Sequence, residues 1–355
     1  MRKPLLSVCI PVYNAGHYLG QCLDSVIRQT LQGIEIICID DGSIDHSPEI
    51  LQAYQSRDNR IQVINQPNSG ALIARKKAVQ SSKGRYICFL DPDDWLTSPD
   101  SLQTMTDAIE QEQVDILHFS SEVIAAQGVD VSGYRRKFRH EEARLTGREA
   151  IIRYWHQRDF WYLWPSIYRR ECCRQACAFI QDIRMSIFED IYLMFIISWF
   201  AGTLKSHPGK PLISYRLGSG ISTKSRLSLT DFQELANAFE GLSHLEHFIQ
   251  ENRGQDRYAG ILAELRHRLT ENTFSMLGKL VQPDVIPAIA CLMGNIDINA
   301  LVQRYSGARH LRYRLLSLLA SGKTKEKYKR KTRLYDNLHH LKETVKAAPL
   351  PGGHR

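Results

Sequence analysis

The stretch CFLDPDDWL, residues 88–96, places three carboxylates directly after an apolar run. Residues 88–90 are apolar, as in a buried strand, and the chain then passes at once into Asp91, Asp93 and Asp94. Acids this close together are explained either by an exposed turn, in which aspartates cap local N–H groups, or by a bound cation. The surrounding sequence favours one of these explanations, because it indicates the kind of sheet to which the strand belongs.

Strand-like and helix-like segments alternate along the first 125 residues. The expected strands are apolar runs at residues 5–14, 34–43, 61–67, 85–91 and 114–124. The expected helices between them lie at residues 16–30, 47–55, 70–82 and 98–113. Continuous apolar strands are buried on both faces, and strand–helix alternation is typical of a mainly parallel sheet covered by helices. The sequence therefore predicts an α/β fold with a Rossmann-like, mainly parallel sheet.

Acidic and small polar residues follow the expected strands. They are PVYN at 11–14, DDGS at 40–43, NSG at 68–70 and DPDD at 91–94. Because the carboxyl ends of parallel strands meet at one edge of a sheet, where ligands bind, these groups are expected to lie together. Two acidic clusters on one edge repel each other unless hydrogen bonds or a cation hold them, and closely spaced carboxylates suit Mg²⁺ or Mn²⁺.

A further pair of acids, Glu189 and Asp190, opens an apolar helix after the less regular region 129–225. Acids at a helix N-terminus are favoured by the helix dipole, so taken alone this pair is explained by capping. A role as catalytic carboxylates is the alternative. From Thr230 onward the apolar spacing is again helical, which predicts an α-helical C-terminal region.

The basic character of the chain belongs to its last residues. The net charge is +8, and residues 309–355 hold 13 lysines and arginines against 3 acids. A leucine-rich face at 311–319 and the basic run after it suit an anionic membrane surface. Packing of the same leucines against the protein body is the alternative. Nucleic-acid binding is not expected, because no recognised module accompanies the charge.

The expected location is the cytoplasm, with peripheral attachment to the inner face of the cell membrane. The first residues, MRKPLLSVCIPVYN, show no signal-peptide pattern, and the apolar segment 191–204 is short for a membrane span. The eight cysteines include no CxxC pair, which favours free thiols in a reducing compartment.

Four blocks of the sequence resemble glycosyltransferase family 2 of the bacterial surface-glycan type, whose members have the GT-A fold. The blocks lie at residues 7–30, 34–51, 65–79 and 84–96. WPSIYRRE at 164–171 and FEDIYLMFIISWFAG at 188–202 resemble later blocks of the family. The resemblance reaches about residue 225. It implies a GT-A domain at 1–225, with a nucleotide-sugar half at 1–125 and an acceptor half at 126–225. The remaining divisions are a helical region at 226–320 and a basic tail at 321–355, either membrane-bound or partly disordered.

The resemblance also implies roles for individual residues. The set expected to bind the nucleotide is Pro11, Val12, Tyr13, Asp41, Asn68, Gly70, Arg75 and Asp91. A Mn²⁺ or Mg²⁺ ion is expected on the acids of the DxD motif, Asp93, Asp91 and Asp94. Asp190 is expected to be the catalytic base, with Glu189 in support. The family commonly has Asn where this chain has Lys76.

The expected activity is that of an inverting, metal-dependent glycosyltransferase. The expected donor is a UDP-hexose or UDP-N-acetylhexosamine, and the expected acceptor is a growing bacterial surface glycan, such as capsule or lipooligosaccharide, free or lipid-linked. One alternative is a nucleotidyltransferase that forms sugar nucleotides, although PVYNAGHYL lacks the Gly-rich basic loop that such an enzyme would carry after its first strand. The other is a non-catalytic scaffold that binds a membrane or partner through the basic tail.

Overall fold

The structure is a computed structural model of the 355-residue chain. It describes residues 3–125, 131–138, 141–185, 187–218 and 228–277. Residues 1–225 together with 237–273 form one compact unit, and residues 226–236 with 274–355 form a second. Residues 226–227 and 278–320 of the expected helical region, and the whole basic tail, lie outside the described residues. The domain boundaries drawn from the sequence stay a prediction.

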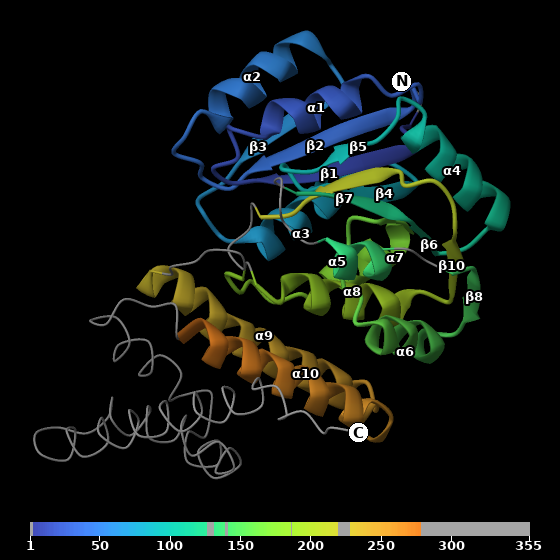
Figure 1. The fold of residues 1–355 in the computed structure, drawn as a ribbon, viewed down its shortest axis with the longest axis vertical. Coiled ribbons are helices and arrows are strands. Elements are labelled where there is room, and N and C mark those ends of the chain that lie inside the picture. The colour runs from blue at the N-terminus through green and yellow to red at the C-terminus, as the bar shows by residue number, and fades with distance from the viewer. Residues whose placement is uncertain (1–2, 126–130, 139–140, 186, 219–227, 278–355) are drawn as a thin grey trace, which may run out of the picture. The chain divides into compact units, whose positions relative to one another are not determined.

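An eight-stranded sheet forms the centre of the first unit (Figure 1). Its order is β3 (Ile61–Asn65), β2 (Ile34–Asp40), β1 (Leu6–Val12), β4 (Tyr86–Phe89), β9 (Ser166–Arg169), β6 (Ile116–Phe119), β10 (Thr203–His207) and β8 (Ala143–Thr146). Neighbours among β1, β2, β3 and β4 pair in parallel, as do β6 and β10. Only β9 and β8 run antiparallel to their neighbours. The predicted mainly parallel sheet is confirmed.

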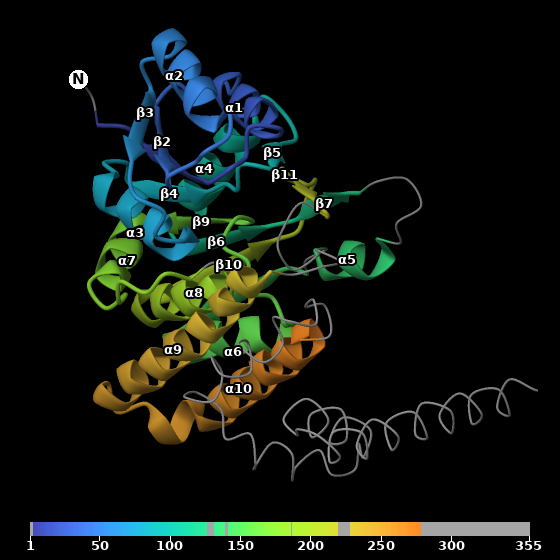
Figure 2. The same ribbon diagram turned by 90° about the vertical axis from the view of Figure 1, so that its left-hand side faces the viewer.

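Helices cover both faces of this sheet (Figures 1 and 2). One face carries α1 (Leu19–Ile27), α2 (Ser47–Arg57) and α4 (Ser101–Glu112). The other carries α3 (Ala71–Ser81), α7 (Arg170–Cys177) and α8 (Glu189–Phe200). The remaining helices are α5 (Ser132–Lys137), α6 (Arg148–Arg158), α9 (Leu229–Glu251) and α10 (Gln255–Leu277). The long pair α9 and α10 fulfils the expectation of helix beyond residue 230.

The prediction of a single strand at 114–124 was wrong in one respect, because this segment forms two strands that belong to different sheets. After β6 the chain changes partners, and β7 (Ser121–Ile124) joins β11 (Ile213–Arg216) and β5 (Trp95–Leu96) in a three-stranded sheet. The change occurs at Ser120, whose carbonyl accepts a hydrogen bond from the Leu212 N–H at 3.2 Å. Ser120, Ser121 and Glu122 separate the apolar residues of the two strands, but so short a polar interruption does not indicate a change of sheet. The small sheet places β11 beside the acidic turn that follows β4.

The most apolar segment of the chain, residues 191–204, is apolar because most of it forms a buried helix. The apolar helix expected after Glu189 and Asp190 is α8, and its residues 192–199 are all buried. The helix ends at Phe200, however, and residues 203–207 form β10 instead of continuing it. Among the residues that the structure describes, no helix has the length and apolar character needed to cross a membrane.

Candidate active site

The predicted nucleotide residues begin where β1 and β2 end. These strands pair with Val12 opposite Asp40, so the residues that follow them emerge side by side. Pro11 and Val12 lie within β1 and are buried, whereas Tyr13 is 48% exposed. Of these three predicted contacts, Tyr13 is therefore the side chain that is accessible to a ligand at this edge.

Asp41 binds the loop that follows β3. Its Oδ1 accepts hydrogen bonds from Gln66 Nε2 at 2.7 Å and from the Ser69 N–H at 2.8 Å. Its Oδ2 accepts one from the Gly70 N–H at 2.8 Å. Gly70 has φ +89°, and a Cβ there would lie 2.8 Å from the Met185 nitrogen, so this position requires glycine. The structure thus brings Asp41 and Gly70 together, as predicted from separate blocks.

The same loop contacts the segment that precedes α8. The Arg184 side chain donates to the Asn68 carbonyl at 3.3 Å, and the Leu72 N–H donates to the Met185 carbonyl at 3.2 Å. Lys76, at the position where the family commonly has Asn, donates to the Ile180 carbonyl at 2.8 Å and to Asp182 Oδ1 at 2.6 Å. Lys76 therefore holds the segment before α8, and its ammonium group is engaged there.

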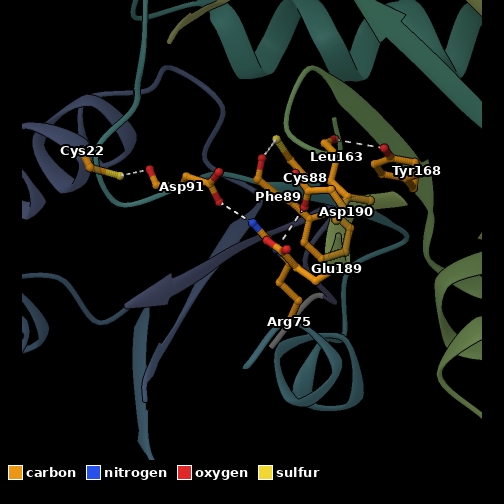
Figure 3. A network of polar contacts seen from close by, with 9 residues as sticks. All are labelled: Cys22, Arg75, Cys88, Phe89, Asp91, Leu163, Tyr168, Glu189 and Asp190. Carbon is orange, nitrogen blue, oxygen red and sulfur yellow. Dashed lines mark hydrogen bonds and ion pairs between the residues drawn. The ribbon is translucent and has the colours of Figure 1, made fainter. Parts of the chain in front are cut away.

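Arg75 lies at the centre of the acidic cluster (Figure 3). Its Nη2 donates to Asp91 Oδ1 at 2.8 Å, and its Nη1 donates to Glu189 Oε1 at 3.1 Å. Nη1 also lies 3.0 Å from Asp190 Oδ1, but without hydrogen-bond geometry, so that contact is a pairing of charges. The Arg75 side chain is only 4% exposed. Four predicted site residues from three elements thus meet around one guanidinium group.

The charges of this cluster are not balanced by Arg75 alone. One cation faces three carboxylates, so the cluster carries an excess of negative charge when all are ionised. Burial raises the pKa of Asp190 well above its usual range; Arg75 opposes this, and Glu189 and Asp91 add to it. Burial likewise raises the pKa of Glu189. Such a cluster attracts positive charge, and its buried acids keep their protons to higher pH than ordinary carboxyl groups do.

Local backbone geometry directs Glu189 and Asp190 into the cluster. Both lie in the first turn of α8, where the helix dipole favours negative charge. The residue before them, Phe188, has φ +72°, a left-handed conformation that costs an aromatic residue about 1–2 kcal/mol. Strain of this kind is common where a chain must aim functional groups. No sequence pattern predicts it.

The acids of the DPDD turn point in different directions. The Asp94 N–H donates to the Asp91 carbonyl at 3.1 Å, which closes a tight turn. Asp91 and Asp93 are partly exposed, whereas Asp94 is fully buried. Asp94 Oδ1 accepts a hydrogen bond from the Arg216 N–H at 2.8 Å, and the Arg216 Nε donates to the Asp93 carbonyl at 3.1 Å. Arg216 was not predicted as a site residue, because in the sequence it resembles an ordinary charged residue at the end of a strand.

The acidic turn offers carboxylates to a divalent cation without forming a complete binding cage. Within the described residues, no group of three or more His, Cys, Asp or Glu side chains is arranged to hold a metal ion. Mg²⁺ is usually bound by one or two carboxylates together with substrate phosphates, and not by a complete protein cage. The partly exposed carboxylates of Asp93 and Asp91 fit that type of site.

Comparison with known proteins agrees with the sequence blocks. Residues 7–174 match the family model described as glycosyl transferase family 2. The uncharacterized glycosyltransferase EpsJ of Bacillus subtilis (strain 168) is 37% identical over 187 residues, which cover 52% of this chain and 53% of the relative. TuaG of the same organism, a glycosyltransferase named for teichuronic acid biosynthesis, is 36% identical over 151 residues, 42% of this chain and 58% of the relative. The chain thus spans little more than half the length of these relatives.

Solved structures share the fold at low sequence identity. S. aureus TarS 1–349 in complex with UDP-GlcNAc has a TM-score of 0.51 and 17% identity, covering 82% of this chain and 88% of that one. The mannosyltransferase PcManGT from Pyrobaculum calidifontis, in complex with GDP-Man and Mn²⁺, has a TM-score of 0.51 and 14% identity, covering 94% and 84%.

The parallel sheet and the solved structures define a GT-A-like fold. The family model and the curated relatives indicate that this fold belongs to a glycosyltransferase domain. The match of residues 7–174 to the model of glycosyl transferase family 2 covers just under half of the chain, and it confirms the resemblance identified from the sequence.

Proposed function

We propose that the chain is an inverting, metal-dependent glycosyltransferase. In this proposal it moves a hexose or N-acetylhexosamine from a UDP-sugar to a hydroxyl group of a growing bacterial surface glycan. The observation that carries the proposal is the convergence of Asp91, Glu189 and Asp190 on Arg75, at the sheet edge where Tyr13 and the Asp41-bound loop lie.

The donor would bind at the ends of β1 and β2. Tyr13 offers an exposed aromatic ring to a base, and the loop held by Asp41 offers backbone groups at the same edge. The choice of a UDP-sugar is supported by the TarS complex with UDP-GlcNAc, which has the same fold.

A Mn²⁺ or Mg²⁺ ion would be held by Asp93, with Asp91 beside it. When bound there, the ion would stabilise the diphosphate leaving group. The carboxylate chemistry of the turn supports this, as does the Mn²⁺ complex of PcManGT. Arg75 keeps Asp91 in a fixed orientation, because it donates a hydrogen bond to that carboxylate.

Asp190 would accept the proton of the acceptor hydroxyl. Its pKa is raised by burial, and a base whose pKa approaches the working pH transfers protons most effectively. Direct attack by the acceptor on the face of the sugar opposite the leaving group would invert the anomeric carbon, as in one-step glycoside hydrolysis. Glu189 would support the base by sharing the Arg75 guanidinium with it.

The acceptor and the location of the enzyme complete the proposal. A bacterial surface glycan as acceptor is supported by the similarity to TuaG. Attachment to the inner face of the cell membrane, with the chain otherwise cytoplasmic, is supported by the excess of basic residues in 309–355. Full-length protein in which Lys323, Lys325, Lys327 and Lys329 are changed to Gln should bind anionic vesicles more weakly than the wild type. Equal binding would argue against attachment through the tail.

A nucleotide-release assay tests the central proposal. The wild type, Asp93→Ala and Asp190→Asn would be incubated with a panel of nucleotide sugars and a lipid-extract acceptor, with and without Mn²⁺. We expect Mn²⁺-dependent release of UDP from one donor, lost in both variants. Pyrophosphate-dependent formation of UTP would instead indicate a nucleotidyltransferase. The absence of both release and nucleotide binding would favour a scaffold.

A further inference from the structure

The three acids of the DPDD turn have unequal surroundings. Asp91 and Asp93 keep part of their surface exposed, whereas the exposed fraction of Asp94 is 0%. Asp94 Oδ1 accepts a hydrogen bond from the Arg216 N–H at 2.8 Å. The carboxylate of Asp94 therefore points into the protein, toward β11, and its donor is a backbone group from the far end of the domain sequence.

Arg216 contacts the same turn through its side chain. Its Nε donates to the Asp93 carbonyl at 3.1 Å, and its Nη2 donates to Gln21 Oε1 at 2.6 Å. The guanidinium carbon lies 4.8 Å from the ring centroids of both Tyr18 and Trp95, distances typical of cation–π contacts. One residue thus joins α1, the acidic turn and the two strands β5 and β11.

These contacts oppose the repulsion within the turn. Three carboxylates in four positions favour an open conformation unless positive charge or hydrogen bonds hold them. Arg75 supplies both beside Asp91, and Arg216 supplies both beside Asp93 and Asp94. Asp94 is fully buried and its Oδ1 is directed at the Arg216 N–H, so its carboxyl group is not placed to reach a cation on the exposed side of the turn.

We propose that Asp94 and Arg216 are positioning residues that fix the DPDD turn, and that Asp94 does not hold the cation. The proposal rests on the proposed function, since it concerns how the turn presents Asp93 to a cation and a nucleoside diphosphate. In this proposal Asp93 and Asp91 are directed toward the nucleotide-sugar donor, whereas Asp94 and Arg216 hold the turn from the side of β11.

Two different substitutions of Asp94 distinguish a residue that anchors the turn from a residue that binds the cation. Asn keeps a side-chain oxygen for the Arg216 N–H but is a weak metal ligand, whereas Ala removes the acceptor. Mn²⁺ binding to the full chain in the presence of UDP would be measured by electron paramagnetic resonance of the free ion, alongside the melting temperature. Asp93→Asn is the ligand control, and Arg28→Lys, an exposed change on α1, is the surface control.

The two substitutions are expected to behave oppositely. Asp94→Ala should weaken Mn²⁺ binding about tenfold and lower the Tm by about 2–4 °C, because the turn loses its anchor. Asp94→Asn should restore both to near the wild-type values. Asp93→Asn should weaken Mn²⁺ binding at least as much as Asp94→Ala, with an unchanged Tm. Arg216→Lys should weaken Mn²⁺ binding and expose Trp95 to acrylamide quenching, because lysine cannot bridge Asp93 and Gln21 between the two rings.

One result overturns the proposal: Asp94→Asn losing Mn²⁺ binding as fully as Asp93→Asn would make Asp94 a ligand. If the wild type binds no Mn²⁺ with UDP, the metal part of the proposed function fails instead. The anchor is then decided by the Tm alone, which must fall in Asp94→Ala and must not fall in Asp94→Asn.

Discussion

Nη2 of Arg75 lies 2.8 Å from Oδ1 of Asp91, and this buried ion pair connects the turn after β4 to the start of α8. The connection arises because the other end of the same guanidinium contacts Glu189 and Asp190, more than 110 residues further along the chain. Burying these charges costs free energy that the pairing recovers only when the geometry is kept. The cluster is therefore sensitive to small changes at Arg75.

Replacing Arg75 by Gln should damage both stability and activity. Three carboxylates would remain without their shared cation, and removing one partner of a buried pair costs about 3–5 kcal/mol. We expect the free energy of unfolding to fall by about that amount in urea titrations, and UDP release to be lost. Arg75→Lys should recover part of the stability but little activity, since one ammonium group cannot bridge Asp91 and Glu189. An Arg28→Gln control, at an exposed ion pair, should change little. Stability unaffected by Arg75→Gln would contradict the proposed cluster.

Asp190→Asn should remove the base while leaving donor binding in place. General-base catalysis contributes about 10²–10⁴-fold in rate, so kcat should fall by that factor. The affinity for UDP, measured by calorimetry, should stay close to that of the wild type, since the proposed contacts to the base, Tyr13 and the Asp41-bound loop, lie at the ends of β1 and β2. The matched variant Glu189→Gln should lose less activity. A larger loss in Glu189→Gln than in Asp190→Asn would reverse the assignment of the base.

The pH dependence follows from the raised pKa of Asp190. A general base acts in its ionised form, so kcat should fall as the pH is lowered through this pKa, above the range of an ordinary aspartate. The same shift means that folding favours the protonated acid. Asp190→Asn should therefore unfold at higher urea concentration than the wild type at pH 8, and this difference should vanish near pH 4. A kcat that stays flat down to pH 4 would exclude Asp190 as the base.

The parallel half of the fold could be predicted because β1, β2 and β4 are buried on both faces. Such strands appear in the sequence as continuous apolar runs, and the acids at their ends stand out. The break between β6 and β7 could not be predicted in this way, since it depends on a hydrogen bond from Leu212, about 90 residues away in sequence. Long-range backbone pairing leaves no local pattern.

The residues of the candidate site could be predicted from the sequence only where they lie in a recognisable family motif. Asp91, Asp190 and Arg75 lie in recognisable blocks, and the structure brings them together. Arg216 follows a short apolar strand and resembles many exposed arginines, so only its contacts with Asp93 and Asp94 reveal it. Burial of Asp94 was equally hidden, because the residue stands among acids that remain accessible.

The buried cysteines should resist alkylation in the folded protein. All seven in the described part of the chain are free and buried, and burial raises the pKa of four of them to about 12: Cys38, Cys88, Cys172 and Cys177. Since the thiolate is the reactive species, iodoacetamide at pH 8 should label them about a thousandfold more slowly than in guanidinium chloride. Peptide mass spectrometry would measure each site separately. Rapid labelling of Cys172 or Cys177 would show that α7 opens in the native state.

Lys76→Asn introduces the residue that the family commonly has at this position, and it should leave the donor site intact. The lysine is 15% exposed and donates to Ile180 and Asp182, so its loss should release the segment before α8 at a cost of about 1 kcal/mol. UDP affinity should stay within about threefold of the wild type, because the ammonium group is directed at that segment and not at the acidic cluster. Lys77→Asn, the same change one position along α3, is the matched control and should alter neither quantity. A tenfold change in UDP affinity in Lys76→Asn alone would mean that position 76 shapes the donor contacts after all, through the segment that it holds.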